Sequence, residues 1–86
     1  MPTISQFYGI VIRMYWMDHA RPHIHAFYSG YEAAFSVSPA AHVKGKFPKN
    51  AKRLVLEWVR LYRNELLDDW DLAEVGARLK RIPGLE

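Results

Sequence analysis

The first half of the chain alternates apolar and polar residues with a period of two, as half-buried β-strands do. The alternation restarts after Pro22 and again after the dipeptide Ser29-Gly30. Ser-Gly between two such runs is typical of a tight hairpin turn. We therefore predict an antiparallel meander whose strands cover residues 8–17, 23–29 and 31–38, with a short fourth strand at 42–47.

The second half changes to a spacing of three and four between apolar residues, which gathers them along one side of an α-helix. Pro48 stands where a helix can begin, and the new spacing follows it. Asp68 or Asp69 can cap a second helix, which Pro83-Gly84 would end. The predicted helices cover residues 49–66 and 69–81.

These elements fit a single domain over residues 1–86, because a domain usually takes about 100–200 residues. The chain is 50% hydrophobic and 14% aromatic, which provides a core and argues against a disordered protein. The fold class we predict is α+β, with a small antiparallel sheet of three to four strands packed against one or two carboxy-terminal helices.

Cysteine content and hydropathy narrow the cellular setting. The chain has no cysteine, which excludes a disulfide framework and any metal site built on thiolates. No apolar run approaches the ~20 residues that a membrane-spanning helix needs, and the start of the chain lacks the basic and apolar regions of a secretion signal. We expect a cytoplasmic protein.

Charge is distributed unevenly, although the net charge is only +3. Residues 42–63 carry seven basic side chains against Glu57 alone, whereas residues 64–75 carry five acidic side chains and no basic one. A basic helix face attracts nucleic acid or an acidic protein; the simpler interpretation is that these side chains only solvate the helix. The candidate binding residues are Lys49, Lys52, Arg53, Arg60 and Arg63.

Three of the four histidines lie close together, next to an aspartate, in the segment Asp18 to His25. Histidine exchanges protons near neutral pH and also ligates metals. On a strand, His23 and His25 must point to the same side. Placing the larger apolar residues of residues 8–17 and 23–29 toward the helices turns both histidines outward, beside Arg13 and Tyr15. This arrangement depends on the strand register, since a slip by one residue would bury the imidazoles.

The first functional hypothesis is cleavage of an RNA phosphodiester by paired imidazoles, one acting as base on the 2′-hydroxyl and the other as acid on the leaving oxygen. Arg13 or a helix arginine would steady the charge at phosphorus. This chemistry needs no cofactor. The candidate catalytic residues are His23, His25, His19, Asp18, Arg13 and Tyr15.

Three other interpretations stay open. His23 and His25, with His19 or Asp18, could ligate a divalent metal such as zinc, because residues i and i+2 of a strand aim both rings at one point. The same face could bind a partner or nucleic acid without chemistry. In the structural interpretation, the histidines are turn and surface residues that bond nearby carbonyls.

The sequence also resembles a short bacterial family called domain of unknown function 4160. The likeness spans essentially the whole chain, and its amino-terminal motif is specific. It is carried by Met1 to Ile10, Met14-Tyr15, Asp18-His19, Pro22 to Ala26 and Tyr28, then by Gly45-x-Phe-Pro48, Leu54-Val55-x-x-Trp58, Glu65-Leu66, Trp70 and Ala73.

Some proteins of this family are described as toxins of two-protein toxin–antitoxin systems. The resemblance therefore implies a toxin-like protein that acts on RNA or the translation machinery, with a small antitoxin protein as partner. It singles out Asp18, His19, His23 and His25 without giving them roles. A second copy of the same chain is a further candidate partner, which would make the protein a homo-oligomer.

Overall fold

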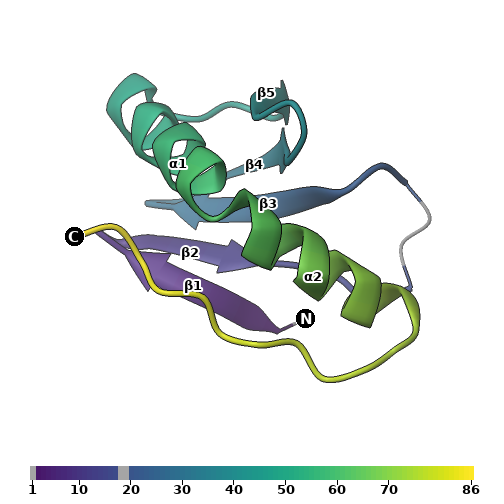
Figure 1. The fold of residues 1–86 in the computed structure, drawn as a ribbon. Helices are drawn as coiled ribbons and strands as arrows, with labels where there is room; N and C mark the ends of the chain where they lie inside the picture. Colours follow the sequence, from purple (N-terminus) through teal and green to yellow (C-terminus); the bar gives the residue numbers. More distant parts are fainter. Residues whose placement is uncertain (1, 18–19) are drawn as a thin grey trace.

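The protein is described here by a computed structural model that covers residues 2–17 and 20–86. Five antiparallel strands lie in chain order across one sheet, and two helices follow them. Figure 1 shows both helices on the same face of the sheet. The α+β class is confirmed, but the predicted count of three to four strands is too low. The elements are β1 Thr3–Phe7, β2 Ile10–Arg13, β3 His23–Tyr28, β4 Tyr31–Ser36, β5 Ala41–Lys44, α1 Lys49–Leu61 and α2 Arg63–Glu74.

The additional strand is β1, which pairs with β2 through a tight turn at Tyr8 and Gly9. Both turn residues have positive φ, 49° and 78°, the conformation that two-residue hairpin turns require. The predicted strand over residues 8–17 was therefore wrong at its start, because it ran through this turn. It was also too long, since β2 ends at Arg13.

Between the helices, the chain bends at Tyr62 without losing its hydrogen bonds. The Tyr62 amide donates to the Trp58 carbonyl at 3.0 Å, and the Leu66 amide donates to the Tyr62 carbonyl at 2.9 Å. One apolar stripe therefore continues across the junction. The predicted boundary near residue 66 was wrong because neither glycine nor proline marks the bend.

The second helix ends earlier than predicted, at Glu74. Gly76 has a φ of 71°, and its amide donates to the Ala73 carbonyl at 3.1 Å while the Ala77 amide donates to the Leu72 carbonyl at 2.9 Å. This pair of bonds is a Schellman motif, in which glycine terminates a helix. The predicted helix over 69–81 was wrong at both ends, and Asp69 lies inside α2 rather than capping it.

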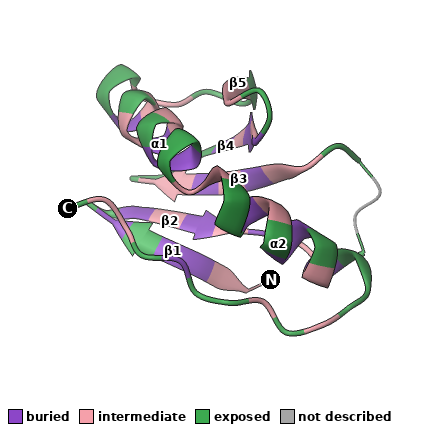
Figure 2. Ribbon diagram, in the orientation of Figure 1, coloured by how far each residue is buried: buried purple, intermediate pink, exposed green. Residues whose placement is uncertain are grey.

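The core lies between the helices and one face of the sheet. Ile10, Ile12 and Met14 are fully buried, as are Ile24 on β3 and Trp58 on α1; a fully buried side chain of this size contributes about 1.5–3 kcal/mol. Figure 2 shows buried residues along the central strands and on both helices, alternating with less buried ones. The alternation of β2 and β3 is thus confirmed, and their other positions turn away from the helices.

The segment after α2 runs back along β1 (Figure 1). The Ile82 amide donates to the Ile4 carbonyl at 2.8 Å, and the Trp58 indole N–H donates to the Pro83 carbonyl at 2.8 Å. Trp16 is one of the larger apolar residues of the predicted strand 8–17, which we placed toward the helices, but it is 46% exposed. It lies beyond the end of β2, where its indole N–H donates to the Ala77 carbonyl at 2.9 Å.

Candidate active site

His23 and His25 lie together on β3, on the side turned away from the core. Their neighbours Ile24 and Ala26 are fully buried, whereas both histidines are half-buried. The two imidazole centroids are 5.1 Å apart, with their planes at 66°. The predicted pairing of the two rings on this face is therefore confirmed.

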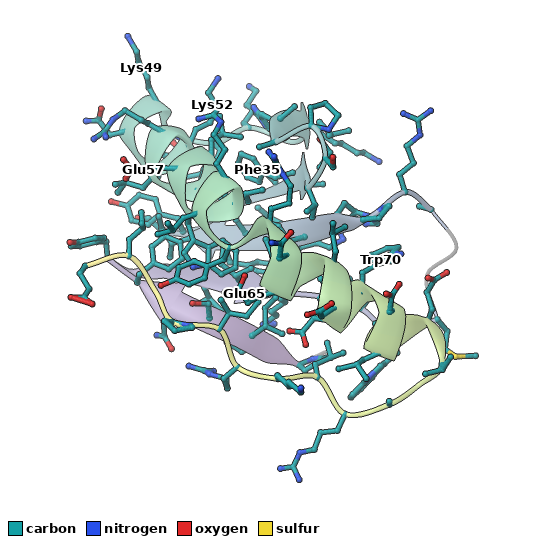
Figure 3. All side chains as sticks on the ribbon, in the orientation of Figure 1. Phe35, Lys49, Lys52, Glu57, Glu65 and Trp70 are labelled. Atoms are coloured by element: carbon teal, nitrogen blue, oxygen red, sulfur yellow. The ribbon has the colours of Figure 1, made fainter. Side chains whose placement is uncertain are left out.

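Two further aromatic rings border the imidazole pair. The Tyr15 ring lies edge-on to His25, with 4.5 Å between centroids. The Trp70 ring lies 5.3 Å from His23, and Figure 3 shows it reaching from α2 toward the start of β3. The four rings restrict how far either imidazole can rotate. Tyr15 was predicted at this position, whereas Trp70 was missed because only the fold brings α2 to β3.

A hydrogen bond sets the tautomer of His23. Its Nδ1 lies 2.7 Å from the backbone carbonyl oxygen of Arg21. Since a carbonyl oxygen can only accept, Nδ1 must carry the proton and donate. In the neutral ring, Nε2 then holds the lone pair, which is the form that a general base requires.

The imidazole pair lines a cavity of about 550 Å³ that is bordered by two cationic side chains. Arg21 contributes one cation from the segment before β3, and Lys44 contributes the other from β5. Ser36 and Ser38 also line it, although the Ser36 hydroxyl donates to the Pro39 carbonyl, and no acidic residue lines it among the described residues. The rest of the lining is apolar and consists of Ala20, Pro22, Ala34, Pro39 and Val43. The two cations of this lining suit an anionic group that needs hydrogen-bond donors.

The sheet register places Lys44 near the histidines. His25 pairs with Ala34 on β4, and Ala34 pairs in turn with Lys44 on β5. The small side chain of Ala34 leaves space between the imidazole and the lysine. A smaller hollow of about 290 Å³ also borders these three residues and includes Glu32.

Gly45 allows β5 to approach β4 this closely. A Cβ at residue 45 would lie only 2.4 Å from the Glu32 carbonyl oxygen, and the φ of Gly45 is +87°. Both features require glycine. The sequence contained this signal in Gly45 itself, but only the tertiary contact reveals its purpose.

Arg13 pairs with His25 across β2 and β3, as the predicted arrangement requires. Its guanidinium carbon, however, lies 5.0 Å from the centre of the Phe27 ring, and its buried Nε has no hydrogen-bond partner. Arg13 does not border the cavity. The structure thus brings Arg21 and Lys44, rather than Arg13, to the place where an anion would sit.

Asp18 and His19, which the sequence assigned both catalytic and metal-binding roles, lie outside the described residues. The described residues contain no group of three or more histidine, cysteine, aspartate or glutamate side chains arranged to hold a metal. The alternative metal site therefore remains a prediction that depends on Asp18 and His19.

The predicted basic face divides between the two helices. Lys49, Lys52, Arg53 and Arg60 line one hollow of about 400 Å³ on α1. Arg63 belongs to α2, and its Nε donates to the Val37 carbonyl at 3.2 Å. Because α1 packs on the core side of the sheet, its basic hollow and the histidine cavity lie on different sides of the molecule.

Comparison with protein families gives a match over most of the chain. A family model described as "Domain of unknown function (DUF4160)" matches residues 9–71. Neither the curated proteins nor the solved structures give a match. In the described part of the chain, neither helix has the length and apolar character to cross a membrane. Since the matched residues include most of the sheet, α1 and most of α2, the protein belongs to the DUF4160 family.

Proposed function

We propose that this protein cleaves the phosphodiester backbone of RNA in the cavity that His23 and His25 line. The observation that carries the proposal is the imidazole pair, 5.1 Å apart, in a cavity bordered by Arg21 and Lys44. Paired imidazoles can transfer protons at both ends of a displacement at phosphorus. The two cations favour the phosphate in the ground state and the added charge in the transition state.

In the proposed reaction, His23 Nε2 removes the proton from a 2′-hydroxyl. The resulting oxygen attacks the adjacent phosphorus, and the bond from phosphorus to the 5′-oxygen of the next nucleotide breaks. His25, in its protonated form, donates a proton to that leaving oxygen. The products are a 2′,3′-cyclic phosphate and a 5′-hydroxyl end. The Nδ1 bond of His23 to the Arg21 carbonyl supports the assignment of His23 as base.

The experiment that tests this function uses the full chain, purified without a histidine tag, and a fluorescent RNA in buffer containing EDTA. We expect cleavage that yields cyclic phosphate ends and stops when the RNA is replaced by DNA of the same sequence. His23→Ala and His25→Ala should abolish it. His42→Ala is the matched control, because His42 stacks on Phe35 with 5.1 Å between ring centroids and does not line the cavity.

Other outcomes of the same experiment reject the proposal. Cleavage that persists in the double variant His23→Ala, His25→Ala would show that the activity comes from elsewhere. Cleavage that EDTA stops and zinc restores would favour the metal alternative. RNA binding without cleavage would favour a binding module, in which the imidazoles only contact phosphate.

We also propose, from the family resemblance, that the protein is the toxin-like member of a bacterial two-protein system with a small antitoxin protein as partner. Cleavage of cellular RNA in the cytoplasm would account for toxicity. Expressing the chain with and without the neighbouring gene tests this setting. Growth arrest that the neighbour relieves supports it, and normal growth on expression of the chain alone contradicts it.

A further inference from the structure

The helices α1 and α2 form a layer on the sheet, which we call the helix layer. The side of this layer that faces solvent is mainly basic along α1 and mainly acidic along α2. Along α1, the exposed Arg53 and Arg60 lie with Lys49 and Lys52 around one hollow. Along α2, every acidic side chain except the buried Asp69 is exposed. The exposed acidic side chains are Glu65, Asp68, Asp71 and Glu74. α1 thus carries four cations and one exposed carboxylate, Glu57, whereas α2 carries four exposed anions and one half-buried cation, Arg63.

The cations of α1 follow one side of the helix. Lys49, Arg53, Leu56 and Arg60 are spaced by four, three and four residues, which places them in one row. At 1.5 Å per residue, this row is about 16 Å long. In Figure 3, Lys49 and Lys52 project away from the sheet. The half-buried Leu56 lies within the row and gives the hollow an apolar part.

The acidic helix has a matching length and lies directly beyond the basic one. α2 comprises 12 residues, or about 18 Å, and Figure 1 shows it continuing from α1 along the same face of the sheet. Along the helix layer, the mainly basic helix α1 is therefore followed by the mainly acidic helix α2, which has a similar length.

We propose that two copies of this chain associate through their helix layers, with α1 of each copy on α2 of the other. A two-fold axis near Tyr62 produces this pairing, because it reverses the direction of the partner's helices. It brings Arg53 opposite Asp71 of the second copy, since both lie nine residues from Tyr62 in the sequence. Symmetry makes each such contact twice.

Charge favours a second copy over nucleic acid as the occupant of α1. An RNA strand laid along the basic row would continue onto α2, where four exposed carboxylates repel phosphate. By contrast, α2 of a second copy is negatively charged and is about as long as the row of cations on α1, so it can cover that row without extending past it. The apolar part that Leu56 contributes also suits a protein surface better than a phosphate backbone.

This association leaves the histidine cavity open, because none of the residues that line the cavity belongs to α1 or α2. The proposal is therefore independent of the proposed cleavage reaction. Since its contacts are exposed ion pairs, which are individually weak and screened by salt, we expect a dimer that forms at high protein concentration and low salt.

The test is sedimentation equilibrium of the untagged full chain at roughly 20 mM and 500 mM NaCl, conditions between which the Debye length falls several-fold. We expect a monomer–dimer equilibrium at low salt and an association at least about tenfold weaker at high salt. Arg53→Glu should weaken the low-salt association by about tenfold or more, and Asp71→Arg should do the same, because each places like charges opposite one another.

The decisive sample is the double variant Arg53→Glu, Asp71→Arg, which restores opposite charges across the axis and should recover dimer formation. Arg78→Glu is the matched control, since Arg78 is exposed but lies beyond α2; it should associate as the unmodified chain does. Circular dichroism checks that each variant folds. A monomer at low salt, a dimer insensitive to salt and to these variants, or failure of the double variant to recover would each overturn the proposal.

Discussion

The histidine cavity and the outer side of the helix layer both concentrate charge, but they hold it in different surroundings. In the cavity, half-buried imidazoles are confined by neighbouring rings and by a bond to the Arg21 carbonyl. On α1, the arginines extend into water. The cations that border the cavity, Arg21 and Lys44, are exposed like those of α1, so the difference lies in the imidazoles, which are held at fixed positions where they can act on one bond. Solvated groups act on whole surfaces and lose their effect in salt. This difference is why we propose catalysis at the first region and association at the second.

The largest expected effect is a loss of RNA cleavage when the histidine cavity is altered, with self-association of the helix layer unchanged. His23→Ala or His25→Ala should lower kcat/KM for RNA cleavage by about 10²–10⁴-fold, the usual contribution of a general acid or base. Neither should change the salt dependence of self-association. The pH profile of the unmodified chain should be bell-shaped, because one imidazole must be neutral while the other is protonated. Initial rates between pH 5 and pH 8 measure this, and a flat profile would contradict paired proton transfer.

The next effect concerns how β5 delivers Lys44 to the cavity. Gly45→Ala should destabilise the fold by about 1–3 kcal/mol and reduce cleavage, because its Cβ would clash with the Glu32 carbonyl at a positive φ. Gly30→Ala is the matched control, since Gly30 has a φ of +86° but no atom within 4 Å of the added Cβ. Urea unfolding should rank Gly45→Ala below Gly30→Ala; equal stabilities would mean that the close approach costs nothing.

A smaller effect on the pH dependence of stability should come from Asp69, which is buried although the other acidic side chains of α2 are exposed. Burial raises the pKa of Asp69, opposed by the hydrogen bond from the Lys80 amide at 2.9 Å and by the Lys80 charge. Because the folded-state pKa lies above the unfolded value of 3.8, the folded protein holds its proton longer. Stability from this group is therefore present below the unfolded pKa and is lost as pH rises through the folded pKa.

Replacing this carboxyl by an amide should remove that pH dependence while keeping an acceptor for Lys80. The stability of Asp69→Asn relative to the unmodified chain should rise between pH 4 and pH 7, by no more than the roughly 1–3 kcal/mol that one unsatisfied buried group costs. Asp68→Asn, on the exposed side of the same turn, should show no comparable trend. Urea midpoints at the two pH values give the comparison, and parallel behaviour of both variants would argue against a raised pKa at Asp69.

The smallest effect is expected for folding and cleavage when the helix surface is altered. Arg53→Glu should change the free energy of unfolding by no more than about 0.5 kcal/mol, as is usual for exposed positions. Its cleavage of a short RNA should match that of the unmodified chain. A clear loss of cleavage would mean that α1 helps to hold RNA, which would join the two regions into one site.

Which strand residues face the core and which face away from it could largely be predicted from local sequence patterns. The period-two alternation placed Ile12 and Ile24 inside and therefore turned His23 and His25 outward together, since neighbouring strand residues face opposite sides. The resemblance to DUF4160 is confirmed by the family match. The errors also have local causes: the Tyr8-Gly9 turn and the Gly76 helix end both carry glycine signals, but the strand and the helix were extended through them.

The amino-acid sequence by itself determined which residues of β2 and β3 face the core, that the two imidazoles share a face, and that basic residues over 42–63 are followed by acidic residues over 64–75. These properties depend on neighbours within a turn or a strand. Only the tertiary structure decided that Lys44 and Trp70 approach the histidines, that Arg13 turns to Phe27, and that the basic helix lies away from the cavity. Those contacts join residues far apart in the chain, so they depend on strand register and on how helices cross the sheet, which no local period specifies.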